Sequence, residues 1–198
     1  LEDKGLMTLP YLLAENPRII VRAWTGAETA GLDYTQRVQG EAMEAVMKLA
    51  RKLGVEDRLD IRPLDFNALS YRHRLEGCHV LLGNSRKEGF LLTAAEALSC
   101  GIPVVVTKTC GIADFIKGGY NGYLIDWNDN PKRLAKIAHR AILKAAKLDP
   151  VKCLASVDQL SLGSNYASAY RPVLANLTHT GLQHENARVT VGVRIHEG

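Results

Sequence analysis

The sequence of 198 residues lacks the marks of several protein classes. Its apolar runs are short, as in Gly101 to Val106, so none is expected to span a bilayer. No basic-then-apolar leader opens the chain, so secretion is not indicated. With 46% hydrophobic and 23% charged residues, the composition excludes collagen-like, disordered and coiled-coil chains. The length and composition therefore indicate a globular protein of one domain, or of one domain with a tail.

Patterns for metals and disulfides are missing as well. The four cysteines form no Cys-x-x-Cys pair, and no Asp-x-Asp pair or His/Cys/Glu cluster has ligand spacing, so we expect no metal. Most of the cysteines sit in or beside apolar segments, which favours buried, reduced thiols and a cytoplasmic location. The net charge of +4 suits an anionic small ligand as well as nucleic acid and does not decide between them.

Strand-like and helix-like segments alternate along the chain. Continuous apolar strands between helices predict an α/β fold, a doubly wound Rossmann-like parallel sheet with helices on both faces. Such sheets bind ligands at the carboxyl ends of their strands. The predicted strands are 18–24, 58–62, 78–82, 103–107 and 123–126, and the predicted helices are 6–14, 40–53, 67–75, 91–99, 112–117 and 131–148.

The pattern weakens toward the C-terminus. One more helix is predicted over 166–177. Residues 178–198 look like a polar tail with a strand over 187–195, so the domain itself is expected to occupy residues 1–177.

The chemistry is expected in the segment from Asn84 to Val104, where a strand runs through a short loop into a helix. The helix start offers unpaired N–H groups to a phosphate, and Gly89 lets a ligand approach the backbone. Glu96 lies in mid-helix among small apolar residues, where sugar hydroxyls could supply the donors that a buried carboxylate needs. Glu88, in the loop, could hold other hydroxyls. Taken singly, Glu88 could instead complement the helix dipole and Glu96 could face water.

The combined pattern resembles the C-terminal donor-binding domain of a GT-B-fold retaining glycosyltransferase of family 4 type. That family carries Glu-x7-Glu between Ser-x-x-Glu-Gly-Phe and Gly-x-Pro-Val. The matching positions are Ser85, Glu88, Gly89, Phe90, Leu92, Glu96, Ala97, Gly101, Pro103 and Val104. The chain departs at Leu91, where the family often has glycine, and at Cys110 and Asp114 in a Gly-Gly-x-x-Glu loop.

The resemblance implies specific roles around a nucleotide-sugar donor, which would be a substrate, with no cofactor and no catalytic metal. Glu88 would hold the sugar hydroxyls and Glu96 the ribose hydroxyls. The N–H groups of Phe90, Leu91 and Leu92 would face the diphosphate. Lys4, in a Lys-Gly pair, would contact the distal phosphate and stabilise the charge of the leaving group. The alternative for Lys4 is a solvated terminal lysine.

The family places a Gly-Arg pair and a central first strand before this lysine, and the sequence begins at Leu1, after that point. The strand's absence would leave two half-sheets with unpaired inner edges, so we expect a longer polypeptide or another chain to supply it. The N-terminal acceptor-binding domain would also come from the same or another chain. Alone, this chain should bind donor but be nearly inactive.

Three functions therefore stay open. The first is transfer of a sugar, with retention of anomeric configuration, from a nucleotide sugar to a hydroxyl acceptor. The second is another GT-B enzyme, such as a nucleotide-sugar epimerase or phosphorylase. The third is a non-catalytic nucleotide-sugar-binding or regulatory module. No nucleic acid partner is expected, and the sequence does not reveal the base, the sugar, the acceptor or the oligomeric state.

The predicted helix over 131–148 carries its cations on one side. A basic amphipathic helix can lie on an anionic membrane, which would place the protein at a membrane surface. The interpretation that we favour from the sequence is a helix packed on the sheet, with a solvated basic face.

Overall fold

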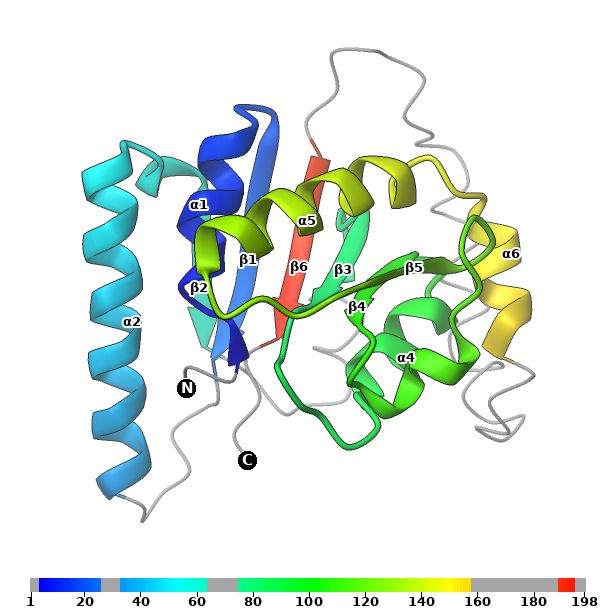
Figure 1. The fold of residues 1–198 in the computed structure, drawn as a ribbon, viewed down its shortest axis with the longest axis horizontal. Helices are drawn as coiled ribbons and strands as arrows, with labels where there is room; N and C mark the ends of the chain where they lie inside the picture. The colour runs from blue at the N-terminus through cyan, green and yellow to red at the C-terminus, as the bar shows by residue number, and fades with distance from the viewer. Residues whose placement is uncertain (1–3, 26–32, 64–74, 158–188, 195–198) are drawn as a thin grey trace.

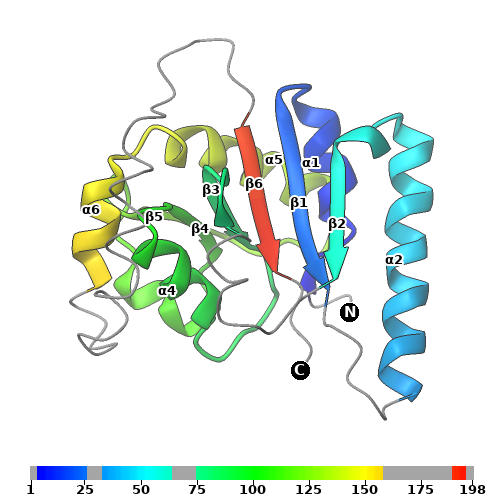
Figure 2. The same ribbon diagram turned by 180° about the vertical axis from the view of Figure 1, so that it is seen from behind.

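The computed structural model describes residues 4–25, 33–63, 75–157 and 189–194. Its core is a six-stranded, wholly parallel sheet in the order β2-β1-β6-β3-β4-β5. The strands are β1 (Ile19–Thr25), β2 (Leu59–Pro63), β3 (Val80–Gly83), β4 (Val104–Thr107), β5 (Gly122–Ile125) and β6 (Val189–Arg194). The arrows of β1, β2 and β6 point to the lower edge of the molecule in Figure 2, whereas β5 lies across the view because the sheet is twisted. The predicted α/β doubly wound sheet is thus confirmed.

Helices cover both faces of the sheet (Figures 1 and 2). On one face lie α1 (Thr8–Glu15) and α5 (Pro131–Ala145), with α2 (Asp33–Leu53) beside α1. On the other lie α4 (Leu92–Ser99) and α6 (Pro150–Ala155). The short 3-10 turns η2 (Glu56–Arg58) and η3 (Gly111–Phe115) complete the described elements.

Successive side chains of a strand point to opposite faces of the sheet, so the core consists of two clusters, one on each face. Val80 and Leu82 of β3 pack with α1 and α5, whereas Leu81 packs with α4. In β4, Val105 belongs to the first face, and its neighbours Val104 and Val106 belong to the second. Because both faces are covered, nearly every position of these strands is apolar, which is why they appear in the sequence as continuous apolar runs.

The central strand of the sheet comes from the C-terminal part of the chain. β6 pairs in parallel with β1 along its whole length, from Ile19↔Val189 to Trp24↔Arg194, and with β3 through Val80↔Val191 and Leu81↔Gly192. The expectation of two half-sheets with unpaired inner edges is therefore wrong. The same chain fills the gap, because a segment distant in sequence has the β-branched residues and the glycine that a buried central strand needs. Residues 189–194 lie in the sheet, within the strand predicted over 187–195, and not in a polar tail.

Other predicted elements differ mainly at their ends. The helix predicted from residue 40 starts earlier, since α2 begins at Asp33. The helix predicted from residue 131 does begin there, with Pro131 in its first turn, and Asn130 caps it by accepting from the N–H groups of Lys132 and Arg133. The helices predicted over 67–75 and 166–177 and the domain boundary at 177 lie outside the described residues, apart from residue 75.

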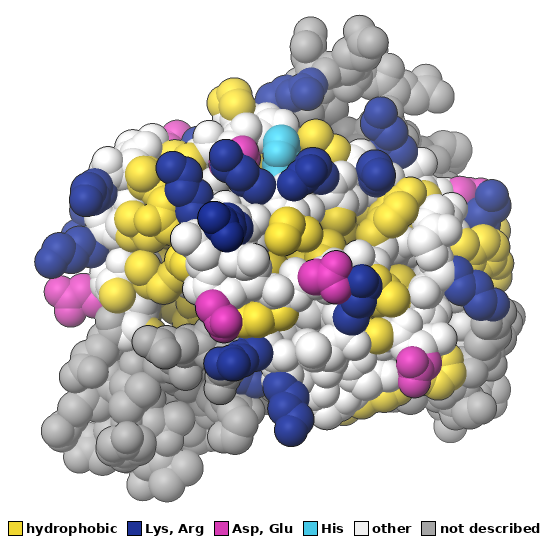
Figure 3. Space-filling view, viewed as in Figure 1, with side chains coloured by type: hydrophobic (Ala, Val, Ile, Leu, Met, Phe, Trp, Pro, Cys, Tyr) yellow, Lys and Arg dark blue, Asp and Glu magenta, His cyan; other side chains and the backbone are white. Residues whose placement is uncertain are grey.

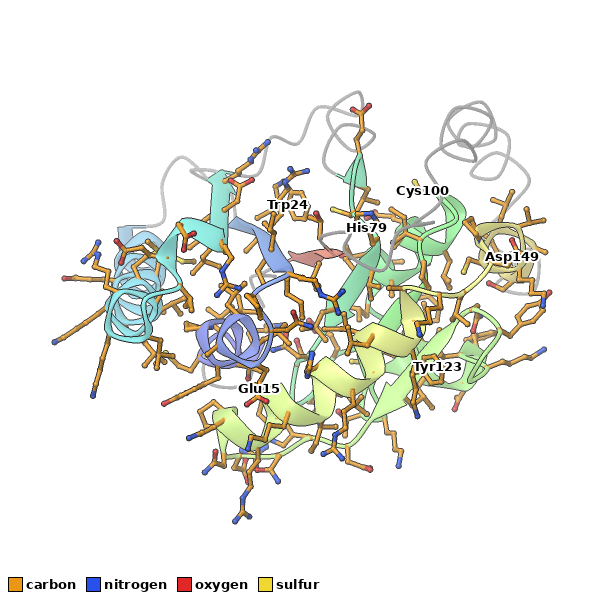
Figure 4. All side chains as sticks on the ribbon, turned by 90° about the horizontal axis from the view of Figure 1, so that it is seen from above. Glu15, Trp24, His79, Cys100, Tyr123 and Asp149 are labelled. Carbon is orange, nitrogen blue, oxygen red and sulfur yellow. The ribbon has the colours of Figure 1, made fainter. Side chains whose placement is uncertain are left out.

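His79 directly precedes β3 and is partly buried. Its Nδ1 accepts a hydrogen bond from the Thr190 N–H at 3.0 Å, so it ties β3 to β6. Burial lowers the pKa of His79, which keeps the ring neutral near pH 7. Figure 4 shows this residue and Trp24 near the centre of the sheet.

The four cysteines are free and buried, as the sequence predicts. Burial raises the pKa of Cys78 to about 11 and that of Cys100 and Cys153 to about 12, and it also raises the pKa of Cys110. Because the thiolate is the reactive form, we expect a disulfide reagent at pH 8 to leave all four unmodified in the native chain and to titrate four after denaturation. Rapid modification of a thiol in the folded chain would contradict this packing.

No helix within the described ranges is both long and apolar enough to cross a membrane.

Candidate functional site

The site centres on an ion pair between the first described residue and the loop that follows β3. Nζ of Lys4 donates to Glu88 Oε1 at 2.9 Å and to Oε2 at 3.2 Å, across 84 positions of sequence. The two side chains are only 16% and 15% exposed. The sequence-predicted sugar and phosphate residues thus meet at one point, and Lys4 is not a solvated terminal lysine.

Backbone geometry brings Lys4 to this position. Gly5 has a φ of +64°, and its carbonyl accepts a buried hydrogen bond of 2.8 Å from Asn84 Nδ2, directly after β3. A Cβ on Gly5 would meet the Asn84 backbone oxygen at 2.5 Å. Glycine is therefore required here on both conformational and steric grounds. The Lys-Gly pair signalled this contact in the sequence, but Asn84 was not singled out as its partner.

Three hydrogen bonds fasten the loop from Ser85 to Phe90 to the neighbouring strand and turn. Thr107 Oγ1 donates to the Ser85 carbonyl at 2.6 Å. The Gly111 N–H donates to the Gly89 carbonyl at 2.8 Å, and the Ile112 N–H donates to that of Phe90 at 3.1 Å. Such bonds fix the loop before any ligand arrives, which lowers the ordering cost of binding.

Leu91 stands where the family often has glycine, and its backbone has a conformation that glycine adopts without strain. Its φ of +65° makes it the one non-glycine residue with positive φ in the described ranges. Its side chain is buried and lies against Gly83, where a Cβ would collide with Leu91 Cδ2. Packing against a residue without a side chain thus offsets the strain, which is on the order of 1–2 kcal/mol.

The start of α4 follows this strained residue. Phe90, Leu91 and Leu92 lie where backbone N–H groups have no carbonyl partner within the helix. The positive end of the helix dipole adds to their attraction for an anion. That these groups face a diphosphate stays a prediction.

Glu96 lies in the second turn of α4. It is partly buried, and its Oε2 is shielded from solvent. Its negative charge contributes, after burial, to the raised pKa of Cys100. The alternative interpretation from the sequence, in which the Glu96 side chain simply faces water, is therefore not supported by its burial.

A cavity of about 460 Å³ has Gly5, the neighbour of Lys4, in its wall, although neither Lys4 nor Glu88 lines it. It runs between the start of α1, the middle of α2 and the loop before α5, and its wall includes Gly5, Arg86, Trp127 and Leu134. Arg86 and Asp129 face each other there at 3.8 Å. Sequence reasoning missed Trp127 and Arg86, because their convergence depends on loops that are 41 positions apart in the chain.

Gly111 offers a test of how rigidly the loop is held. A Cβ at this position would overlap the Gly89 carbonyl oxygen, which is backbone and can give way only if the loop moves. We expect Gly111→Ala to lower the free energy of unfolding by about 1–3 kcal/mol. The control is Gly118→Ala, whose Cβ would meet only Tyr123 Cδ1 at 3.9 Å and should cost less than about 0.5 kcal/mol. Denaturant titration of the two variants makes the comparison, and equal losses would show that the loop is not clamped.

A parallel sheet in the order β2-β1-β6-β3-β4-β5, with a charged pair and a helix start at its carboxyl edge, defines a doubly wound, Rossmann-like domain with a ligand edge. The family model described as glycosyl transferases group 1 matches residues 29–149. The chain therefore belongs to the group 1 glycosyltransferase family.

Curated relatives agree with this family. A D-inositol 3-phosphate glycosyltransferase from Streptomyces bingchenggensis is 33% identical over 145 residues, which are 70% of this chain and 29% of the relative. D-inositol 3-phosphate glycosyltransferase 1 from Catenulispora acidiphila is 28% identical over 173 residues, 81% of this chain and 40% of the relative. The chain thus spans well under half the length of these proteins.

Solved structures show the same fold. Anabaena HepE in complex with UDP aligns with a TM-score of 0.62 and 21% identity over 89% of this chain and 45% of its own. The C-terminal domain of a group 1 glycosyltransferase, LpcC from Francisella tularensis, aligns with a TM-score of 0.58 and 17% identity over 80% of each chain. The fold is that of the C-terminal half of GT-B glycosyltransferases, as the resemblance implied.

Proposed function

We propose that this chain supplies the nucleotide-sugar donor site of a glycosyltransferase that moves the sugar to a hydroxyl acceptor with retention of anomeric configuration. The ion pair between Lys4 and Glu88 is the observation that carries the proposal. A cation and a carboxylate that meet at the start of a helix suit a ligand with both a phosphate and hydroxyl groups.

The expected chemistry is electrostatic. As the bond between sugar and diphosphate breaks, negative charge grows on the leaving nucleoside diphosphate. Lys4 and the N–H groups of Phe90, Leu91 and Leu92 would stabilise that charge, while Glu88 would orient the sugar through its hydroxyls. Because these groups are already fixed by the fold, they need little reorganisation during the reaction.

Glu96 would bind the ribose hydroxyls. Its partly buried carboxylate lies about one helical turn after Leu92, on the helix whose start would face the diphosphate. Hydroxyl donors would satisfy the shielded oxygen better than bulk water can.

The acceptor half would come from an N-terminal GT-B domain in the same or another chain. The relatives are more than twice as long as the matched part, which supports this division. The four free cysteines support a reducing, cytoplasmic setting.

Calorimetric titration with UDP-, GDP- and ADP-sugars tests the donor site. The HepE structures that contain UDP or UDP-glucose make the uridine series the first to try. We expect one of the series to bind, and Glu96→Ala to weaken it by about tenfold or more through the loss of hydrogen bonds to a charged group. Glu44→Ala on α2, an exposed glutamate away from the loop, is the matched control and should bind as the parent does. Failure of all three series to bind, or equal losses in both variants, would contradict the proposal.

A further inference from the structure

The outer face of α5 carries a concentration of positive charge that the donor site does not use. Five cations lie on this helix, and all are exposed: Lys132, Arg133, Lys136, Arg140 and Lys144. At about 100° per residue they fall within roughly one third of the helix circumference. Lys147, also exposed, follows directly. Figure 3 shows Lys and Arg side chains spread across the part of this face that α5 occupies in Figure 1.

Little on the molecule neutralises this charge. The sequence of α5 contains no Asp or Glu. Among the described residues, Arg22, Arg62, Arg86 and Lys108 form ion pairs with aspartates, but no ion pair involves the five α5 cations. The acids around the helix are Asp129 before it, Asp149 after it, and Glu15 at the end of α1, which acts on the half-buried ring of His139 (Figure 4). The cations therefore present a nearly uncompensated field to solvent.

Apolar side chains accompany the cations on the same face. Leu143 lies within the angular sector that the cations define, and Ile137 lies about 20° beyond its edge. Both are only partly buried, although the opposite side of the helix, with Leu134, Ala138 and Ile142, is fully packed on the sheet. Lysine and arginine stems can spread over such apolar residues while their charges reach outward.

We propose that the α5 face binds the surface of a membrane that contains anionic lipid. The helix has 15 residues and is about 22 Å long, so its cations lie along its whole length on one side and can all face a flat surface. The exposed parts of Leu143 and Ile137, which are both partly buried, can meet the headgroup region, which a nucleic acid backbone does not offer to apolar side chains. Charge and apolar area together are what holds an interfacial helix at a lipid surface. This proposal does not depend on the donor site.

The placement leaves the ligand edge open. α5 lies on the front face in Figure 1, whereas the segment that leads from β3 to α4 runs along the lower edge. A membrane against α5 would therefore run alongside the sheet, and the loop with Glu88 would open next to the lipid surface. An acceptor held at that surface could approach the donor from the side.

Vesicle cosedimentation of the full chain tests the proposal. The probes are phosphatidylcholine vesicles with and without phosphatidylglycerol, each at low and at physiological salt. We expect binding only to the anionic vesicles, weakened by salt. Each cation near an anionic surface contributes about fivefold, so the variant Lys136→Gln/Arg140→Gln/Lys144→Gln should lose binding by about a hundredfold.

The matched control removes the same number of exposed cations from α2, with Lys48→Gln/Arg51→Gln/Lys52→Gln, and should bind within about threefold of the parent. Circular dichroism checks that both variants are folded. Absence of binding by the parent chain would overturn the proposal, and so would equal losses in the two variants, which would mean that net charge alone is responsible. Binding to duplex nucleic acid without binding to anionic vesicles would overturn it as well.

Discussion

A chain that lacks residues 189–198 will not fold cooperatively. The deletion removes β6, which pairs with six residues of β1 and joins that half of the sheet to β3. Val191, fully buried between the two faces, would leave with it, and both β1 and β3 would expose unpaired edges. The expected loss exceeds the usual 5–15 kcal/mol stability of a domain, so thermal unfolding followed by circular dichroism should show no cooperative transition.

A point substitution in β6 also tests whether this strand is part of the sheet, without shortening the chain. Gly192 is buried in β6, where a Cβ would stand 3.3 Å from Cys78 Sγ and 3.4 Å from the Trp24 ring. Valine at this position adds two more carbons, so Gly192→Val should cost about 1–3 kcal/mol of unfolding free energy. Thr190→Val, two positions earlier on the same strand and less buried, is the control and should change it by less than about 1 kcal/mol. A truncated chain that melts like the parent would show that β6 is not part of the sheet.

Replacing Lys4 should weaken donor binding in a chain that still folds. Lys4→Met keeps the length of the stem and removes the charge that we assign to the distal phosphate. The loss of a charge-assisted contact of about 2 kcal/mol should raise the Kd for the nucleotide sugar by about thirtyfold. Because Glu88 is only 15% exposed and loses its partner, the free energy of unfolding should also fall, by about 1–3 kcal/mol.

The control for Lys4 is Lys87→Met, which removes an exposed cation directly beside Glu88. Its Kd should stay within about threefold of the parent value, because solvent and salt largely screen an exposed charge that makes no contact assigned to the donor. Calorimetry supplies both Kd values. If the two variants bind alike, Lys4 is an ordinary partner of Glu88 and the assignment to a phosphate is wrong.

The local part of the donor site could be predicted from the sequence. The loop from Ser85 to Phe90 and the helix after it are contiguous, so the amide positions of Phe90, Leu91 and Leu92 follow from where the helix starts. The roles given to Glu88, Glu96 and Lys4 still rest on the family resemblance. What the structure adds is the contact between Lys4 and Glu88, which depends on Gly5 and Asn84 meeting across the sheet edge.

The non-local part could not be predicted. A strand is predicted over 187–195, but a strand's partners are set by packing that no local pattern encodes. From the sequence, the sheet is expected to lack its central strand. In the structure β6, from the C-terminal part of the chain, occupies that position between β1 and β3. Leu91 is a second case, since its positive φ is tolerated only because its side chain lies over Gly83, a neighbour eight positions earlier.

The most direct test of the donor site is to titrate the nucleotide sugar that binds into isotope-labelled protein and to follow the backbone amide resonances. We expect the largest shifts at Phe90, Leu91 and Leu92, with smaller ones at Gly5 and Gly111, whose backbone groups touch the loop. Binding that leaves the amides at the start of α4 unmoved, and shifts resonances elsewhere, would contradict the account.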